Sequence, residues 1–208
     1  MATDVGRILD NLLAFYDFGG KTVIAVGAGG GQLAGYGRPA KRVVAVDRDA
    51  AAMDKLKESS RQLGLQDRFE YWSGDFCACD RHGDTVLFEF CLHEMDDPAA
   101  ALGKAMILAP ETVVIDHAPN SVWIYYGAED DKVERSWRAL EAFSVTRRSG
   151  YNAEQRFRDF QELHEKVSLQ GDESLRRIEE FRGQSNIVIP MSYALALIRR
   201  PAQSGLND

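Results

Sequence analysis

The sequence is poor in cysteine, has fewer basic than acidic residues and lacks any long apolar run. Its three cysteines, Cys77, Cys79 and Cys91, are an odd number and form no disulfide framework of the kind found in small secreted domains. No apolar stretch approaches the ~20 residues needed to cross a bilayer. The N-terminus lacks the basic start of a signal peptide. These absences predict a cytoplasmic protein with no membrane partner.

The charge balance and the cysteine spacing argue against two further classes of partner, nucleic acids and metal ions. The chain has 25 Lys and Arg against 32 Asp and Glu, a net charge of −7. Proteins that bind nucleic acid need a basic surface to neutralise phosphates, so such a partner is disfavoured. Cys77 and Cys79 are separated by one residue, which does not match the usual zinc pairs, and no second Cys/His pair follows nearby. The sequence therefore predicts no metal site.

Short apolar runs alternate with helical patterns through residue 117, which is typical of β-α-β units around a parallel sheet. The expected strands cover residues 22–26, 42–47, 69–72, 85–90 and 112–116. Helices are expected over 50–63 and from a cap at Asp97 to about Leu108, with Pro98 in the first turn. We predict an α/β fold with a doubly wound, mostly parallel sheet of the seven-stranded type and helices on both faces.

The regions outside residues 22–117 have different patterns. Residues 1–18 predict an N-terminal amphipathic helix, and residues 118–185, charged and helical in pattern, predict a helical lid that shapes a substrate region. Strand character returns over 187–190 and 193–198, so residues 186–200 are expected to close the sheet with an antiparallel edge. The tail from Pro201 to Asp208 is expected to be loose. The whole chain, 1–208, is expected to form one domain.

Glycine occupies four of the five positions 27–31, directly after the first expected strand. Glycine lets the backbone pass close to a ligand where a Cβ would collide, and open α/β sheets bind ligands beyond the carboxyl ends of their strands. Gly29-x-Gly31-x-x-Ala34, with Asp47 eighteen residues after Gly29, fits a dinucleotide template and hence an NAD(P)-dependent oxidoreductase. Because this match is weak alone, the remaining motifs decide between cofactors.

Those motifs resemble, in order, the motifs of the class I S-adenosylmethionine-dependent methyltransferases. Residues 27–31 resemble the family's G-x-G-x-G motif, and Asp47 lies where the family places the acid that binds the ribose hydroxyls. Asp75, within the segment 74–76, resembles the residue that accepts from the adenine amino group. Residues 92–98, LHEMDDP, resemble the family's LHH-x-x-DP motif. Residues 108–110, LAP, resemble the family's turn before strand five. A dehydrogenase would have no reason to carry LHEMDDP.

The resemblance implies a methyltransferase that uses S-adenosylmethionine as its cofactor, held by a core of residues 22–117. The residues expected to bind the cofactor are Gly27, Ala28, Gly29, Gly31, Asp47, Arg48, Asp75, Phe76 and Phe90. If the acceptor must lose a proton, His93, Glu94 and His117 are the candidate catalytic residues. Methyltransferases of nucleic-acid bases commonly carry Asn/Asp-Pro-Pro-aromatic after strand four, where this chain has FCLH at 90–93. We therefore expect a small-molecule acceptor.

Three positions depart from the pattern of the family or of an apolar strand. The family usually has an acid two residues before its first motif glycine, where it helps to hold the methionine part of the cofactor, and here that residue is Ala25. Glu111 stands where the turn before strand five usually has glycine. A non-catalytic cofactor-binding or interaction domain is therefore an alternative, beside the oxidoreductase. Glu89 lies within an apolar strand, where an unpaired carboxylate is costly, so it is expected to be paired or to face the site.

Overall fold

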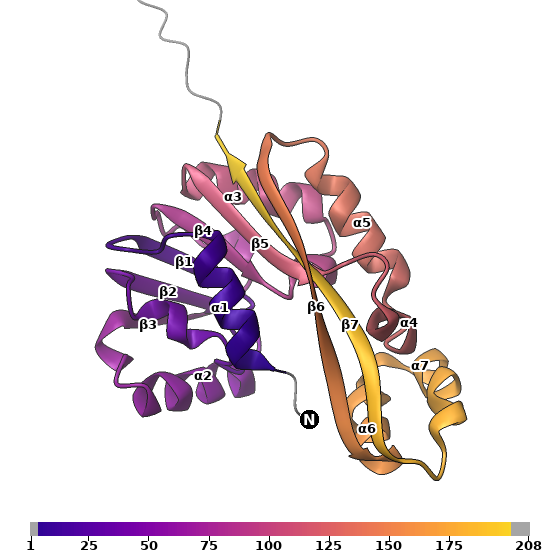
Figure 1. Ribbon diagram of the computed structural model, residues 1–208. Helices are drawn as coiled ribbons and strands as arrows, with labels where there is room; N and C mark the ends of the chain where they lie inside the picture. Colours follow the sequence, from indigo (N-terminus) through magenta and orange to yellow (C-terminus); the bar gives the residue numbers. More distant parts are fainter. Residues whose placement is uncertain (1–3, 201–208) are drawn as a thin grey trace, which may run out of the picture.

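The computed structural model describes residues 4–200 and shows a seven-stranded sheet with helices on both faces (Figure 1). The strand order is β3-β2-β1-β4-β5-β7-β6. The parallel strands are β1 (Thr22–Val26), β2 (Arg42–Asp47), β3 (Phe69–Ser73), β4 (Thr85–Glu89) and β5 (Glu111–His117). β7 (Ser185–Arg199) is antiparallel to β5, and β6 (Val145–Asp159) to β7. The predicted fold class is confirmed.

The central strands are buried on both faces, which explains why their sequences are continuous apolar runs. Val23 and Ala25 of β1 face the cluster that includes residues of α1 (Val5–Phe15) and α2 (Ala50–Gln62). Ile24 and Val26 face the opposite cluster, with α3 (Pro98–Leu108) and α5 (Asp130–Leu140). This alternation follows from the two-residue period of side chains along a strand. The sheet therefore separates two apolar layers.

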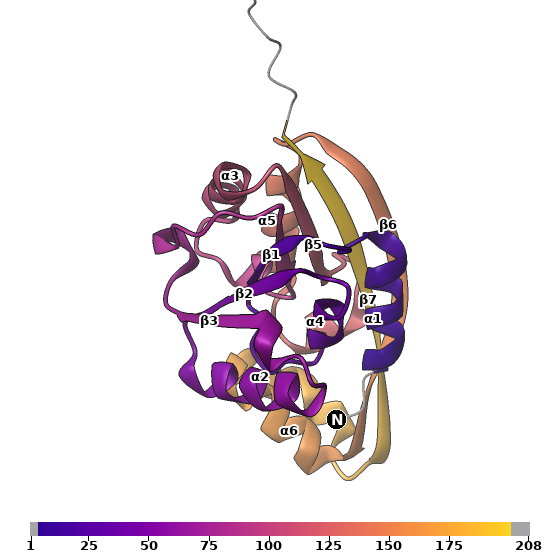
Figure 2. The same cartoon turned by 90° about the vertical axis from the view of Figure 1, so that its left-hand side faces the viewer.

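Helices α2 and α3 begin where the sequence predicts. The carboxylate of Asp49 accepts from the first-turn N–H groups of α2, and that of Asp97 accepts from Ala100 N–H in α3, which has Pro98 at its first turn. The N-terminal helix is confirmed as α1, which lies beside β6 and β7 (Figure 2). Asn11 Nδ2 donates to Tyr193 Oη across that contact at 2.7 Å. The remainder of the predicted 1–18 segment before residue 4, and the tail 201–208, lie outside the described residues.

The prediction of a helical lid over 118–185 is wrong in part. This region contains α4 (Val122–Tyr126), α5, α6 (Phe160–Val167) and α7 (Asp172–Arg177), but residues 145–159 form the long strand β6. Only Gln155 and Phe157 of β6 are buried, so its sequence lacks the apolar alternation that marks a strand. Pairing with β7 makes it extended. β6, not the C-terminal strand, is the edge, and the two predicted runs 187–190 and 193–198 are one strand, β7.

The β6–β7 pair extends beyond the parallel strands and carries α6 and α7 at its far end, as the orange and yellow ribbons of Figure 1 show. The pair thereby brings residues from the C-terminal half next to the ends of β4 and β5. Across residues 4–200, no helix has the length and apolar composition needed to span a membrane.

Glu89, at the end of β4, is paired inside the protein. Tyr36 Oη donates to Glu89 Oε1 at 2.7 Å, and both side chains are buried. Burial raises the pKa of Glu89 to about 7; the hydrogen bond from Tyr36 opposes this rise, and the charge of Asp47 adds to it. The carboxyl therefore holds a proton more strongly in the folded than in the unfolded chain.

Leu102 and Ile107 on α3 provide a test of the packing. Leu102 is fully buried against the sheet, whereas Ile107 is 66% exposed. We expect Leu102→Ala to lower the free energy of unfolding by about 2–5 kcal/mol, because it leaves a cavity, and Ile107→Ala to change it by less than about 0.5 kcal/mol. Urea denaturation measures both. Equal losses would contradict the placement of α3.

Glu89→Gln tests the buried carboxyl through the pH dependence of stability. The pKa of Glu89 rises from 4.5 to about 7 on folding, so its favourable contribution is complete below about pH 4.5 and is lost as the pH rises to about 7. The Gln variant lacks this titration but keeps an acceptor for Tyr36. We expect wild type to lose stability relative to the variant, by about 3 kcal/mol at most, between these pH values. A difference in unfolding free energy between wild type and Glu89→Gln that does not change with pH would contradict this prediction.

Candidate functional site

A cavity of about 270 Å³ lies beyond the carboxyl ends of β1, β2 and β3. Most of the residues predicted to bind the cofactor line it: Gly27, Gly29, Asp47, Arg48, Asp75 and Phe76. Ala28 is instead buried in the core, and Gly31 packs against α2. Phe90 lines a neighbouring cavity. The structure thus brings together the glycine turn and both acids that sequence motifs had singled out.

Close packing explains the glycines of this turn. Gly27 has φ +69°, and a Cβ there would lie 2.4 Å from Cys91 Cβ. A Cβ on Gly29 would lie 2.5 Å from Asp47 Oδ2 and 2.6 Å from Ala52 Cβ. At both positions a larger residue would displace its neighbours, so the cavity wall at this point is bare backbone.

Backbone hydrogen bonds hold the two acids in place. Asp47 Oδ2 accepts from Gly29 N–H at 3.0 Å, and its Oδ1 accepts from Asp49 N–H at 2.9 Å. Asp75 Oδ1 accepts from Cys77 N–H at 2.7 Å, which caps a short 3₁₀ helix. An ionised carboxylate has about four acceptor positions. Each acid therefore keeps capacity to accept hydrogen bonds from a ligand.

The segment after the glycine turn differs from its counterpart in dinucleotide-binding proteins. Those proteins place the pyrophosphate at the N-terminus of an α-helix that begins at the glycines. Here the turn leads to a four-residue 3₁₀ helix, Ala34–Gly37, and then to β2. The local structure therefore does not support the oxidoreductase alternative.

A second cavity, of about 320 Å³, lies at the ends of β4 and β5 and shares Glu94 with the first. All three candidate catalytic residues line it, as do side chains from α1, α4, β6, β7 and the segment after α6. These residues are Ile8, Gln32, Phe90, His93, Glu94, His117, Trp123, Glu129, Gln155, Lys166, Gln170 and Met191. A larger cavity, of about 600 Å³, lies between α1 and the β6–β7 pair, away from the glycine turn.

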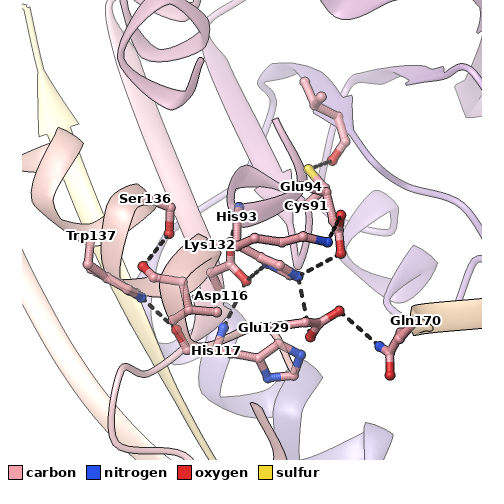
Figure 3. Close-up of polar contacts among 12 residues, drawn as sticks. Cys91, His93, Glu94, Asp116, His117, Glu129, Lys132, Ser136, Trp137 and Gln170 are labelled. Atoms are coloured by element: carbon pink, nitrogen blue, oxygen red, sulfur yellow. Dashed lines mark hydrogen bonds and ion pairs between the residues drawn. The ribbon is translucent and has the colours of Figure 1, made fainter. Parts of the chain in front are cut away.

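A buried carboxylate on β5 organises the second cavity (Figure 3). Asp116 is fully buried, and its Oδ1 lies 2.6 Å from His93 Nδ1. It also accepts from the backbone N–H groups of His93 at 3.0 Å and His117 at 2.8 Å. Because Asp116 engages Nδ1, the other ring nitrogen of His93 faces Glu94, at 3.4 Å, and Glu129, at 3.9 Å.

Burial and these charges act in different directions on the titratable groups. Burial alone would lower the pKa of His93, but the charge and hydrogen bond of Asp116, with Glu94 and Glu129, raise it to about 10. Burial lowers the pKa of His117 to about 4 and raises that of Glu129 to about 7. The hydrogen bond with His93 holds the pKa of Glu94 well below its usual range. The cavity is therefore rich in negative charge around one imidazole.

Phe90 has an unusual backbone conformation in the turn that lies between the two cavities. It follows β4 with φ +49°, a left-handed conformation that non-glycine residues adopt mainly where function or packing requires it. Its ring centroid lies 5.1 Å from that of His117 and 6.0 Å from that of Tyr193. The turn thus directs Phe90 into the second cavity and Cys91 toward the first.

Sequence reasoning did not identify Asp116, Glu129 and Gln170 as site residues. Asp116 follows a run of apolar residues and directly precedes His117, so its position at a strand end was the available signal. Glu129 and Gln170 lie in segments whose position over the sheet depends on the course of the chain after β5. No local pattern marks them.

The comparisons with known proteins agree with this geometry. Residues 24–111 match the family model described as a methyltransferase domain. No curated protein matches the chain in sequence. Among solved structures, a candidate methyltransferase from Bacillus halodurans superposes with a TM-score of 0.67 at 18% identity, covering 95% of this chain and 99% of that one.

Two further solved structures have the same fold. An S-adenosylmethionine-dependent methyltransferase from Aquifex aeolicus gives a TM-score of 0.59 at 16% identity, with 95% of this chain and 90% of that one covered. The magnesium protoporphyrin IX methyltransferase from Synechocystis PCC 6803, with bound S-adenosylhomocysteine, gives 0.60 at 14% identity, with 94% and 81% covered. Residues 24–111 thus match a methyltransferase domain, and the chain as described shares its fold with S-adenosylmethionine-dependent methyltransferases.

Proposed function

We propose that the chain binds S-adenosylmethionine in the cavity at the glycine turn and methylates a small molecule in the adjacent cavity. One observation carries the proposal. The two cavities meet at Glu94, on the edge of the sheet where the parallel strands end. One contains Asp47 and Asp75, and the other contains the buried His93 and His117. A donor and an acceptor bound in these cavities would be neighbours.

The first cavity has the features that the cofactor needs. Gly27 and Gly29 present a cradle of bare backbone, because a Cβ at either position would collide with Cys91 or Asp47. Asp47 and Asp75, fixed by backbone N–H groups, can accept from the ribose hydroxyls and the adenine amino group. Ala25 provides no carboxylate for the methionine part, but Glu94 does line the cavity. The cofactor supplies an activated methyl group.

The second cavity is suited to orient a small acceptor. Its volume of about 320 Å³ falls at the small end of the range for small-molecule sites. Phe90, Trp123 and Met191 provide apolar walls, and His93 and His117 provide polar groups. Holding donor and acceptor in line contributes most of what such a reaction requires from the protein. His93, Glu94 and His117 are positioned to bind the acceptor or to take its proton.

Asp47→Ala tests the cofactor assignment. Loss of a hydrogen-bonding carboxylate from this cavity should raise the dissociation constant of S-adenosylmethionine or S-adenosylhomocysteine by about 10- to 100-fold, because hydrogen bonds to charged groups contribute about 1.5–3 kcal/mol. Isothermal titration calorimetry measures this. Asp54→Ala removes an exposed acid of α2 that pairs only with Lys57 in the described structure, and it should bind as wild type does.

Gly29→Ala tests the cradle without removing a polar group. Its methyl group would collide with Asp47 Oδ2, so we expect the dissociation constant for S-adenosylhomocysteine to rise by about 10-fold or more. Gly103→Ala is the matched control, because a Cβ at that position on α3 meets nothing within 4 Å. It should leave binding unchanged and stabilise the helix by about 0.5–1 kcal/mol.

Thermal shifts with four ligands distinguish the alternatives. A ligand at 100 times its dissociation constant stabilises the folded state by about 2.7 kcal/mol. We expect stabilisation by S-adenosylmethionine and S-adenosylhomocysteine but not by NAD or NADP. Stabilisation by NAD alone would establish the oxidoreductase instead. Formation of S-adenosylhomocysteine in the presence of an acceptor panel then distinguishes an enzyme from a non-catalytic binding domain.

A further inference from the structure

The polar side chains of the second cavity form a set of metal ligands. His93, His117 and Glu129 are all buried, and each offers a ligand atom within 4.8 Å of the others. Two imidazoles and one carboxylate bind catalytic zinc and non-haem iron in proteins. We propose that His93, His117 and Glu129 bind a divalent transition-metal ion, for which Zn²⁺ is the best match, beside the methyl-donor cavity.

The supporting contacts of His93 and Glu129 are those expected around a metal site. Asp116 Oδ1 lies 2.6 Å from His93 Nδ1, which holds a proton on Nδ1 and directs Nε2 to the cavity, where a metal ion would replace the Nε2 proton. Gln170 Nε2 donates to Glu129 Oε1 at 2.9 Å, so that Oε2 faces His93 (Figure 3). A carboxylate behind a ligating histidine and an amide behind a ligating carboxylate orient ligands in this way.

His117 lacks a hydrogen-bond partner that its burial requires. Within the described chain, its Nδ1 is buried and makes no hydrogen bond, and buried polar atoms without partners are rare. The residue is held in place nonetheless: Trp137 Nε1 donates to its carbonyl oxygen at 2.5 Å, and its ring contacts Phe90. A cation in this cluster would engage an imidazole that is otherwise only packed.

The charges around the cluster also favour a cation. Asp116, Glu94 and Glu129 all lie within 4 Å of His93. Two lysines oppose these acids: Lys132, whose Nζ lies 2.9 Å from Glu94 Oε2, and Lys166, which lines the same cavity. Three carboxylates close to one imidazole form an anionic environment in which a divalent ion can take the place of the Nε2 proton of His93.

The spacing is close to that of a bound ion. Ligand atoms about 2.1 Å from a tetrahedral ion lie about 3.4 Å apart. His93 Nε2 and Glu129 Oε2 are 3.9 Å apart, and the largest separation within the set is under 4.8 Å. Shifts of about 1 Å in side chains would complete the site. Three protein ligands leave a coordination position open to the cavity, as in catalytic zinc sites.

The site narrows the class of acceptor, and this part of the inference rests on the proposed function. A divalent ion binds hydroxyl and thiol groups and lowers their pKa. The acceptor class that fits is therefore a small molecule that carries an ionisable hydroxyl or thiol next to the methylated position or at it. His93 and His117 would then act as ligands, and the acceptor would release its proton to solvent on binding the ion, so a separate general base is not needed. The methylated atom would form its bond to the methyl group as the carbon–sulfur bond of S-adenosylmethionine breaks, which leaves S-adenosylhomocysteine.

Metal content tests the site directly. Wild-type protein stripped with a chelator is titrated with Co²⁺ and Zn²⁺ and analysed by absorption spectroscopy and mass spectrometry of the metal. We expect about one ion per chain, with a cobalt spectrum free of thiolate bands, and a dissociation constant at least about 10-fold higher in His93→Ala, His117→Ala and Glu129→Gln. His82→Ala, at an exposed histidine outside the cluster, should bind as wild type does.

Other outcomes would overturn the inference. Absence of Co²⁺ and Zn²⁺ binding at micromolar concentration, thiolate bands in the cobalt spectrum, or equal losses in His82→Ala would each do so. Circular dichroism identifies any variant that fails to fold, and Glu129→Gln, which keeps the shape of the side chain, then decides the question. Calorimetry with S-adenosylhomocysteine on the same wild-type sample separates the two proposals. Cofactor binding without metal binding overturns only the metal site, whereas metal binding without cofactor binding overturns only the proposed function.

Discussion

Parallel pairing of β1 with both β2 and β4 is the constraint on which the rest of the structure depends. In parallel strands all carboxyl ends lie on the same edge of the sheet, and the strand order reverses at β1. The glycine turn, Asp47 and the segment after β4 therefore meet there, although they are far apart in sequence. Bare backbone at Gly27 and Gly29 lets the segments approach each other closely enough to form one wall.

Buried charge distinguishes the second cavity from the first. Asp47 and Asp75 are held by backbone N–H groups at the rim, whereas Asp116 is fully buried near the carboxyl end of β5. A carboxylate in that position is tolerated because it receives two backbone N–H groups and contacts His93. The buried Asp116 fixes the orientation of the His93 imidazole, which lines the cavity. This supporting network is the chemical basis for the proposed metal site.

Two positions differ from the methyltransferase pattern that the sequence resembles. Ala25 lacks the acid usual in the first strand, and on the same face of the sheet Glu89 of β4 forms a buried hydrogen bond with Tyr36. Glu89 does not line the cofactor cavity, so it supports the sheet edge and does not replace the missing acid there. Glu94 lines both cavities and is the carboxylate that we propose for the methionine end of the cofactor.

The sequence alone was sufficient to predict the parallel core, because strands buried on both faces are continuous apolar runs. It was also sufficient to predict the glycine turn with its two acids, because Asp47 ends β2 and Asp75 comes two residues after β3. It could not reveal β6, whose side chains are mostly exposed and whose extended form depends on pairing with β7. Nor could it associate His93 and His117 with Asp116, Glu129 and Gln170. These residues come together only when α5, β6 and α6 fold back over the ends of β4 and β5, since such contacts are set by the path of the chain and not by local pattern.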